Sequence, residues 1–237
     1  MSRRASKVLA GALRQGAFRV RHALVRHRLQ RVDEVELLGL SLRVEPGVFH
    51  PALFRSSRLL AAYVRSLVLE GRRVLDMGTG SGLVGLCAAR AGGRVVAVDV
   101  NPLAARCARD NAEANRLSDR MEVLEGDLFA PLGGRGPFDD VFWNPPFYRG
   151  VPRTAAERAW HAGPDYDVIG AFAARIAEFL SPQGRVVLVL SSDIELDHVR
   201  ALFTSRGLQA GSLRTERGLF ESLSLEEFRS PAPSNRG

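Results

Sequence analysis

The sequence predicts an α/β fold built on a mostly parallel sheet of seven strands, with a C-terminal antiparallel strand and helices on both faces. Two observations carry this expectation. Apolar strand-like segments alternate with helical segments of about 10–15 residues, which is typical of parallel sheets with right-handed crossovers. The residues least suited to a core, namely glycines, acids and an Asn-Pro-Pro corner, follow those strands directly.

The first half of the chain gives two successive strand and helix units after a short entry region. Residues 35–44 form a strand or hairpin, and the Pro and Gly of residues 46–51 form a loop. The expected elements then run as helix 56–69, strand 72–77, a glycine turn, helix 83–92 and strand 94–100.

The second half continues the alternation and ends in an antiparallel pair. Pro102 stands at the first position of a helix, where its missing N–H costs nothing. The expected elements are helix 102–117, strand 121–129, strand 138–144, a long loop, helix 167–180, strand 184–192, helix 195–207 and paired strands over 208–217 and 218–228.

The basic character of the chain lies at its N-terminus. The net charge is +7, yet residues 1–31 hold eight Arg and one Lys and no acid. We therefore expect three regions: a basic arm or helix over 1–34, one folded domain over 35–229 and a disordered tail over 230–237. Residues 1–31 are read as a capping helix, an electrostatic arm for nucleic acid or ribosome, or a transit peptide.

The cysteine content and the distribution of apolar residues exclude several classes of protein. The two cysteines, Cys87 and Cys107, give no disulfide framework, and no cluster of His and Cys predicts a metal site. No segment approaches the roughly 18 apolar residues of a membrane span. Arginines also interrupt the N-terminus where a secretory signal would be apolar, so we expect a cytoplasmic protein without membrane contact. The sequence leaves the oligomeric state open.

The glycine turn after strand 72–77 and the acids after three strands indicate the ligand. The turn reads D-x-G-x-G-x-G from Asp76 through Gly82. Asp99 ends the second strand, where it can accept bonds from ribose hydroxyls, and Asp127 ends the third, where it can accept from an adenine amine. Three acids and no basic residue in the turn favour a ligand with ribose and adenine but no phosphate, such as S-adenosylmethionine (SAM), over a dinucleotide.

These segments resemble the class I SAM-dependent methyltransferases, which have a Rossmann-like fold, and more narrowly the HemK/PrmC group of small-domain methyltransferases. The resemblance is carried by "VLDMGTGSG", "VVAVDVNPLA", "GDLFAPL" and "FDDVFWNPPFY". It implies SAM as cofactor, with S-adenosylhomocysteine as product. The cofactor residues it implies are Asp76, Gly78, Thr79, Gly80, Gly82, Asp99, Val100, Asp127, Leu128 and Asn144.

The Asn-Pro-Pro-Phe corner at 144–147 indicates the chemistry. An amide or aromatic amine is a poor nucleophile because its lone pair is delocalised. Two acceptors on its N–H groups, the Asn144 side-chain oxygen and the Pro145 carbonyl, can localise that lone pair toward a methyl group. Phe147 can stack on the planar group. We therefore expect Asn144, Pro145 and Phe147 to be the catalytic residues of an N-methyltransferase.

The sequence leaves open which class of molecule accepts the methyl group. A glutamine side-chain amide of a protein, as in release-factor methylation, is the leading candidate, and an exocyclic amine of an rRNA or tRNA base is the alternative. A small-molecule amine and a non-catalytic RNA-binding module are further alternatives. "PGVFHP" resembles a segment of rRNA guanine methyltransferases, and the short N-terminal region resembles glutamine methyltransferases that need a small activating partner. The expected acceptor-side residues are Phe49, His50, Pro146, Tyr148 and Trp160.

Overall fold

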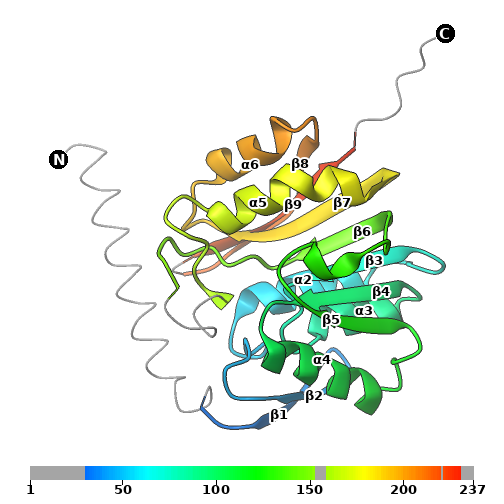
Figure 1. Ribbon diagram of the computed structural model, residues 1–237. Coiled ribbons are helices and arrows are strands. Elements are labelled where there is room, and N and C mark those ends of the chain that lie inside the picture. Colours follow the sequence, from blue (N-terminus) through cyan, green and yellow to red (C-terminus); the bar gives the residue numbers. More distant parts are fainter. Residues whose placement is uncertain (1–29, 153–158, 220, 231–237) are drawn as a thin grey trace.

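A seven-stranded sheet forms the centre of the molecule (Figure 1). The computed structural model describes residues 30–152, 159–219 and 221–230. The strand order is β5-β4-β3-β6-β7-β9-β8, in which β9 alone runs antiparallel to its neighbours. The bounds are β3 (Arg73–Met77), β4 (Arg94–Asp99), β5 (Met121–Glu125), β6 (Phe138–Trp143), β7 (Leu180–Ser191), β8 (Gln209–Arg217) and β9 (Ser222–Arg229).

Helices cover both faces of this sheet, as the sequence predicts (Figure 1). One face carries α2 (Arg55–Arg65), α3 (Leu83–Arg90) and α4 (Pro102–Ala114), and the other carries α5 (Asp167–Arg175) and α6 (Leu196–Thr204). Two short 3₁₀ turns, η1 (Ala130–Leu132) and η3 (Ile176–Phe179), lie on the second face with α5.

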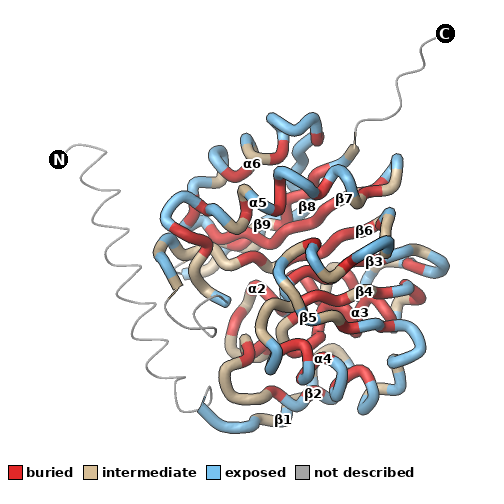
Figure 2. The backbone as a smooth tube through the Cα atoms, in the orientation of Figure 1, coloured by how far each residue is buried: buried red, intermediate tan, exposed pale blue. Residues whose placement is uncertain are grey.

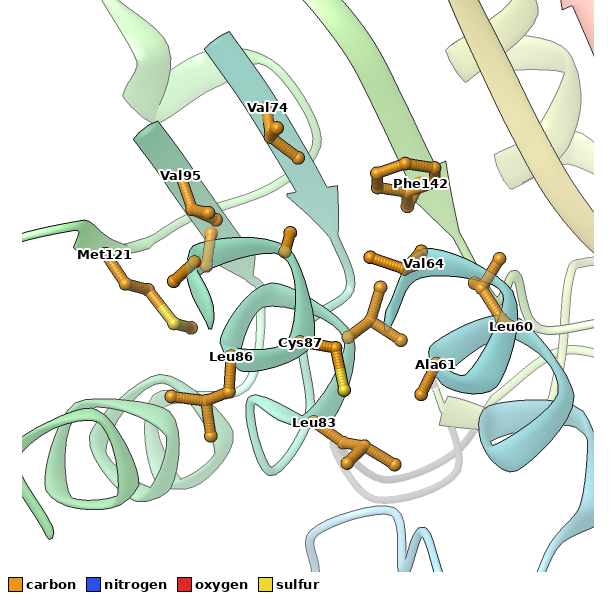
Figure 3. Close-up of a cluster of buried hydrophobic side chains, with 14 of the residues drawn as sticks. Leu60, Ala61, Val64, Val74, Leu83, Leu86, Cys87, Val95, Met121 and Phe142 are labelled. Atoms are coloured by element: carbon orange, nitrogen blue, oxygen red, sulfur yellow. The ribbon is translucent and has the colours of Figure 1, made fainter. Parts of the chain in front are cut away.

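Two buried hydrophobic clusters hold the layers together. Successive residues of a strand point to opposite faces, so Val74 of β3 joins the cluster under α2 and α3 while Leu75 joins the one under α5 and α6. The central strands β3, β6 and β7 are largely buried, as strands of parallel sheets are, whereas the edge strand β8 is exposed along most of its length (Figure 2). Figure 3 shows the first cluster, where side chains of α2, α3 and the strands meet, among them Leu60, Val64, Val74, Leu86, Cys87, Val95 and Phe142.

A separate two-stranded hairpin, β1 (Asp33–Leu37) with β2 (Leu40–Val44), packs against α4. Asn111 of α4 and Asn115, the residue that caps the C-terminus of α4, bind the free edge of β2. Asn111 accepts from the Arg43 N–H at 2.8 Å and donates to the Arg43 carbonyl at 2.9 Å. Asn115 makes the same pair of bonds with Ser41, at 3.1 and 2.8 Å. The Asn111 amide also donates to the Ser81 carbonyl at 2.9 Å, in the turn after β3.

The element boundaries differ from the expected ones mainly at element ends. The predicted strand 121–129 stops at Glu125, because Gly126 and Leu128 take positive φ values of 156° and 46° that leave the extended backbone. The helix predicted over 167–180 ends as the 3₁₀ turn η3. The helix expected over 56–69 ends at Arg65.

The predicted arm over 1–34 and tail over 230–237 lie almost entirely outside the described residues. Within the parts of the chain that are described, no helix is both long and apolar enough to cross a bilayer.

Candidate active site

A cavity of about 360 Å³ opens at the carboxyl ends of β3, β4, β5 and β6. This is the edge of an open α/β sheet at which ligands bind. The wall combines the turn after β3, the ends of β4 and β5, the Asn-Pro-Pro corner after β6 and two loops. Its members include Gly47, Phe49, Ser57, Asp76, Gly78, Thr79, Gly80, Asp99, Val100, Asn101, Asp127, Leu128, Trp143, Asn144, Pro145, Pro146, Phe147, Tyr148, Trp160 and His161.

The turn after β3 is shaped by its glycines. Gly78 has φ of 64°, a left-handed conformation that costs an L-residue energy, and a Cβ there would lie 3.2 Å from Nε1 of Trp143. The Thr79 N–H donates to the Val98 carbonyl at 3.0 Å, so the turn is tied to β4. The turn thus brings backbone close to the cavity without a side chain in the way.

Asp76 lies beneath this turn and is fully buried. Its Oδ2 accepts from the Thr79 hydroxyl at 2.6 Å and from the Gly85 N–H at 2.9 Å, which joins the turn to the start of α3. Burial raises the pKa of Asp76 to about 7, against the opposite effect of these two bonds. Asp76 therefore organises the turn as well as lining the cavity.

Asp99 stands at the end of β4 with both carboxylate oxygens engaged. Oδ2 accepts from the Gly80 N–H at 2.8 Å, and Oδ1 accepts from the Asn101 N–H at 2.9 Å. Burial raises the pKa of Asp99, and the two backbone bonds partly oppose this effect. Each oxygen keeps a second lone pair for a ligand hydroxyl.

The third acid, Asp127, follows the end of β5 and is exposed at the cavity wall. Its neighbour Leu128 also lines the cavity and has φ of 46°. A bulky residue in the left-handed region is uncommon and is often found at binding sites.

The Asn-Pro-Pro corner places an amide at the cavity wall. The Asn144 Nδ2 donates to the Ser57 hydroxyl of α2 at 3.1 Å. Its Oδ1 is buried, and no described residue gives it a hydrogen bond. A buried acceptor without a partner in the protein calls for a donor from outside it, such as a ligand or a water.

A backbone hydrogen bond joins two lining residues, Tyr148 and Trp160. The Tyr148 N–H donates to the Trp160 carbonyl at 2.9 Å. The Trp160 ring then packs on Phe49 and Phe54, with ring centroids 4.7 and 4.6 Å apart. Phe49 and Trp160, which are far apart in the sequence, thus meet at the cavity wall.

Of the residues predicted from sequence, all but two line this cavity. Gly82 is one exception: it caps α3 with φ of 90°, and a Cβ there would come within 3.3 Å of Ala108 in α4, so the glycine serves helix packing. His50 is the other: it is buried, with Nε2 2.9 Å from the Asp33 carboxylate on the hairpin.

The polar residues at the cavity that were not predicted from the sequence include Asn101 and Ser57. Asn101 lines the wall and caps α4 by accepting from the Leu103 N–H at 3.1 Å, a role that the following proline at the first helical position could have indicated. Ser57 reaches Asn144 from 87 residues away, and no local pattern marks it.

The lining fits SAM. Its described residues include three aspartates and no Lys or Arg, which suits a positive sulfonium and ribose hydroxyls and does not suit a pyrophosphate. Aromatic and apolar residues supply the surface for an adenine ring.

Comparisons with known proteins show the family of this chain. The family model described as methyltransferase small domain matches residues 39–210. A ribosomal protein L11 methyltransferase of Pelotomaculum thermopropionicum is 37% identical over 70% of this chain and 46% of its own length. The chain thus spans about half of that relative. A putative protein N5-glutamine methyltransferase of Methanocaldococcus jannaschii is 31% identical over 68% of this chain and 80% of its own length.

Other relatives are named as tRNA and ribosomal RNA methyltransferases. Among solved structures, the T. thermophilus 16S rRNA N2 methyltransferase RsmC, in complex with AdoMet and guanosine, superposes with a TM-score of 0.66 at 24% identity. That match covers 85% of this chain and 50% of RsmC, and it supports the fold. The chain belongs to the methyltransferase small domain family, a family of SAM-dependent methyltransferases.

Proposed function

We propose that the protein methylates a planar nitrogen, and that this nitrogen is the side-chain amide of a glutamine in a protein. The observation that carries the proposal is the Asn144 Oδ1, a buried acceptor at the cavity wall to which no described residue donates. An acceptor nitrogen that bears N–H groups is the donor that this oxygen needs. The similarity to a putative glutamine methyltransferase over most of that protein's length supports the choice of glutamine.

SAM, when bound, supplies an electrophilic methyl group. The residues of this chain then have to hold the acceptor nitrogen and localise its lone pair. In this proposal Asn144 Oδ1 and the Pro145 carbonyl accept from the two N–H groups, and Phe147 packs on the plane of the amide. The proton leaves after transfer, so no strong base is needed. Positioning of this kind can lower a barrier by about 7–11 kcal/mol.

The acceptor class is tested by following label from methyl-labelled SAM. The full-length protein is incubated with an extract of cells that lack it, and the extract is treated with ribonuclease or with protease before counting. We expect label that survives ribonuclease and is lost to protease, with methylglutamine after hydrolysis. Label lost to ribonuclease alone would contradict the glutamine proposal.

The role of the corner is tested by substitution at Asn144. Asn144→Ala should lower turnover by about 10²-fold or more, as when a transition-state hydrogen bond is removed, and leave SAM affinity within a few-fold. Asn144→Asp keeps an acceptor oxygen and should retain part of the activity. Wild-type turnover in a folded Asn144→Ala protein would refute the proposed role.

An exocyclic amine of an RNA base is the second candidate, and the charge of residues 1–31 favours it. Those residues hold nine cations and no acid, which suits a phosphate backbone. RNA affinity should then fall steeply with salt, and removal of residues 1–31 should abolish most of it. Unchanged RNA binding after that deletion would eliminate the arm as an RNA contact.

A further inference from the structure

A hydrogen bond joins the proposed catalytic amide to the first turn of α2. Ser57 is the third residue of that helix, is 7% exposed and lines the cavity. Its hydroxyl accepts from Nδ2 of Asn144 at 3.1 Å. Among the described residues, this is the hydrogen bond that the Asn144 side chain makes, since Oδ1 has none.

A hydrogen bond to a neighbouring side chain restrains an asparagine amide, and in this structure the Ser57 hydroxyl accepts from the NH₂ group, although a serine hydroxyl can also donate. Its terminal torsion is broad and roughly two-fold, and a half turn exchanges the oxygen with the NH₂ group. Pro145 and Pro146 restrain the backbone but leave this torsion free. In the flipped orientation Ser57 would donate to Oδ1, and the NH₂ group would oppose the N–H groups of a methyl acceptor.

We propose that Ser57 is a positioning residue: its hydroxyl holds the Asn144 NH₂ group and so keeps Oδ1 turned toward the acceptor nitrogen. This inference rests on the proposed function of Asn144. Ser57 does not touch the reacting atoms in this scheme and acts through the amide alone. Its contribution should therefore appear in turnover and be absent from cofactor binding.

Substitution of Ser57 should separate these two quantities. Loss of one neutral hydrogen bond corresponds to roughly a tenfold effect. Ser57→Ala should lower the turnover of label transfer into the extract fraction that the enzyme methylates by about tenfold. Its SAM affinity, measured by calorimetry on the full chain, should stay within about twofold. Ser57→Thr keeps the hydroxyl and should restore most of the turnover.

The same helix offers a matched control. Ser56 is also buried, at 4% exposed, and it does not line the cavity. Ser56→Ala removes a buried hydroxyl from the adjacent position and should leave turnover near that of the wild type. Equal losses from Ser56→Ala and Ser57→Ala would assign the effect to helix packing and overturn the inference.

A double-mutant cycle with Asn144→Ala gives the decisive readout. If Ser57 acts only through Asn144, then Ser57→Ala should have no further effect in the Asn144→Ala background. Losses that multiply would show an independent role and overturn the inference. The two proposals also fail differently. Wild-type turnover in Asn144→Ala removes the proposed function, whereas impaired Asn144→Ala beside unimpaired Ser57→Ala removes only the role of Ser57.

Discussion

Replacement of Asp99 should weaken SAM binding more than it weakens the fold. Asp99→Ala removes the acceptor of the Gly80 and Asn101 N–H groups, at 2.8 and 2.9 Å, together with the lone pairs left for the ribose. The Gly80 and Asn101 groups lie at the cavity edge, where water can replace the lost acceptor. The ligand, by contrast, loses a partner fixed in its bound position.

The magnitude follows from the charge on the acceptor. A hydrogen bond to a charged group contributes about 1.5–3 kcal/mol, which is roughly ten- to a hundredfold in the dissociation constant. Asp99→Asn keeps one acceptor oxygen but turns an NH₂ group toward the other backbone N–H. We therefore expect a loss near the lower end of that range for Asp99→Asn and near the upper end for Asp99→Ala.

Calorimetric titration of the full chain with SAM measures the affinity, and thermal unfolding without ligand reports the fold. Asp110→Ala is a suitable control, because Asp110 is an exposed carboxylate of α4 that lies outside the cavity lining and forms an ion pair with Arg106 at 3.9 Å. It should bind SAM as the wild type does. An Asp99→Ala protein that also binds SAM with wild-type affinity would refute the assignment of Asp99 to the ribose.

Two further substitutions test the turn after β3. Gly78→Ala should lower the free energy of unfolding by more than the roughly 1–2 kcal/mol of a left-handed L-residue, because its Cβ would also crowd Trp143. Gly71→Ala, with φ of 73° and no atom within 4 Å of its Cβ, should show the backbone cost alone, and equal losses in denaturant unfolding would contradict the crowding. At Asp76 the pKa is raised from 3.8 to about 7, so the folded state holds a proton that the unfolded state has lost. This contribution is complete below about pH 4, declines as the pH rises to about 7 and, by the shift, amounts to at most about 4 kcal/mol. The free energy of unfolding of Asp76→Asn should therefore fall less between pH 5 and pH 8 than that of the wild type, and parallel profiles would refute the shift.

The fold was predictable because its signals are periodic and local. Apolar strands, helical spacing and glycine turns alternate along the chain, and the structure confirms the seven-stranded sheet and its antiparallel strand β9. Ends of elements were less predictable. Gly126 signalled the early end of β5, but the positive φ of Leu128 is imposed by its surroundings and has no counterpart in residue type.

Some residues of the candidate site were predictable from the sequence and others were not. Residues at or just after the ends of strands, such as Asp99 and Asn144, meet at the cavity because parallel strands end at one edge of the sheet. The motif pattern also included Gly82, whose constraint is contact with α4, and His50, which is held by Asp33. Ser57 could not be predicted, because its significance lies in a contact between segments distant in sequence.

Asn111 and Asn115, in α4 and at its C-terminus, help to fix the position of the cavity wall. An edge strand with one neighbour can slip, and a slip of one residue turns every side chain to the opposite face. Asn111 and Asn115 occupy the free edge of β2 as a third strand would, so a slip would break four hydrogen bonds at once. The chain that leaves β2 carries Phe49, whose Cβ lies 3.9 Å from the position a Cβ on Gly80 would take. The position of Phe49 over the turn after β3 thus depends on Asn111 of α4 and on Asn115 at its C-terminus, which lie outside the sheet.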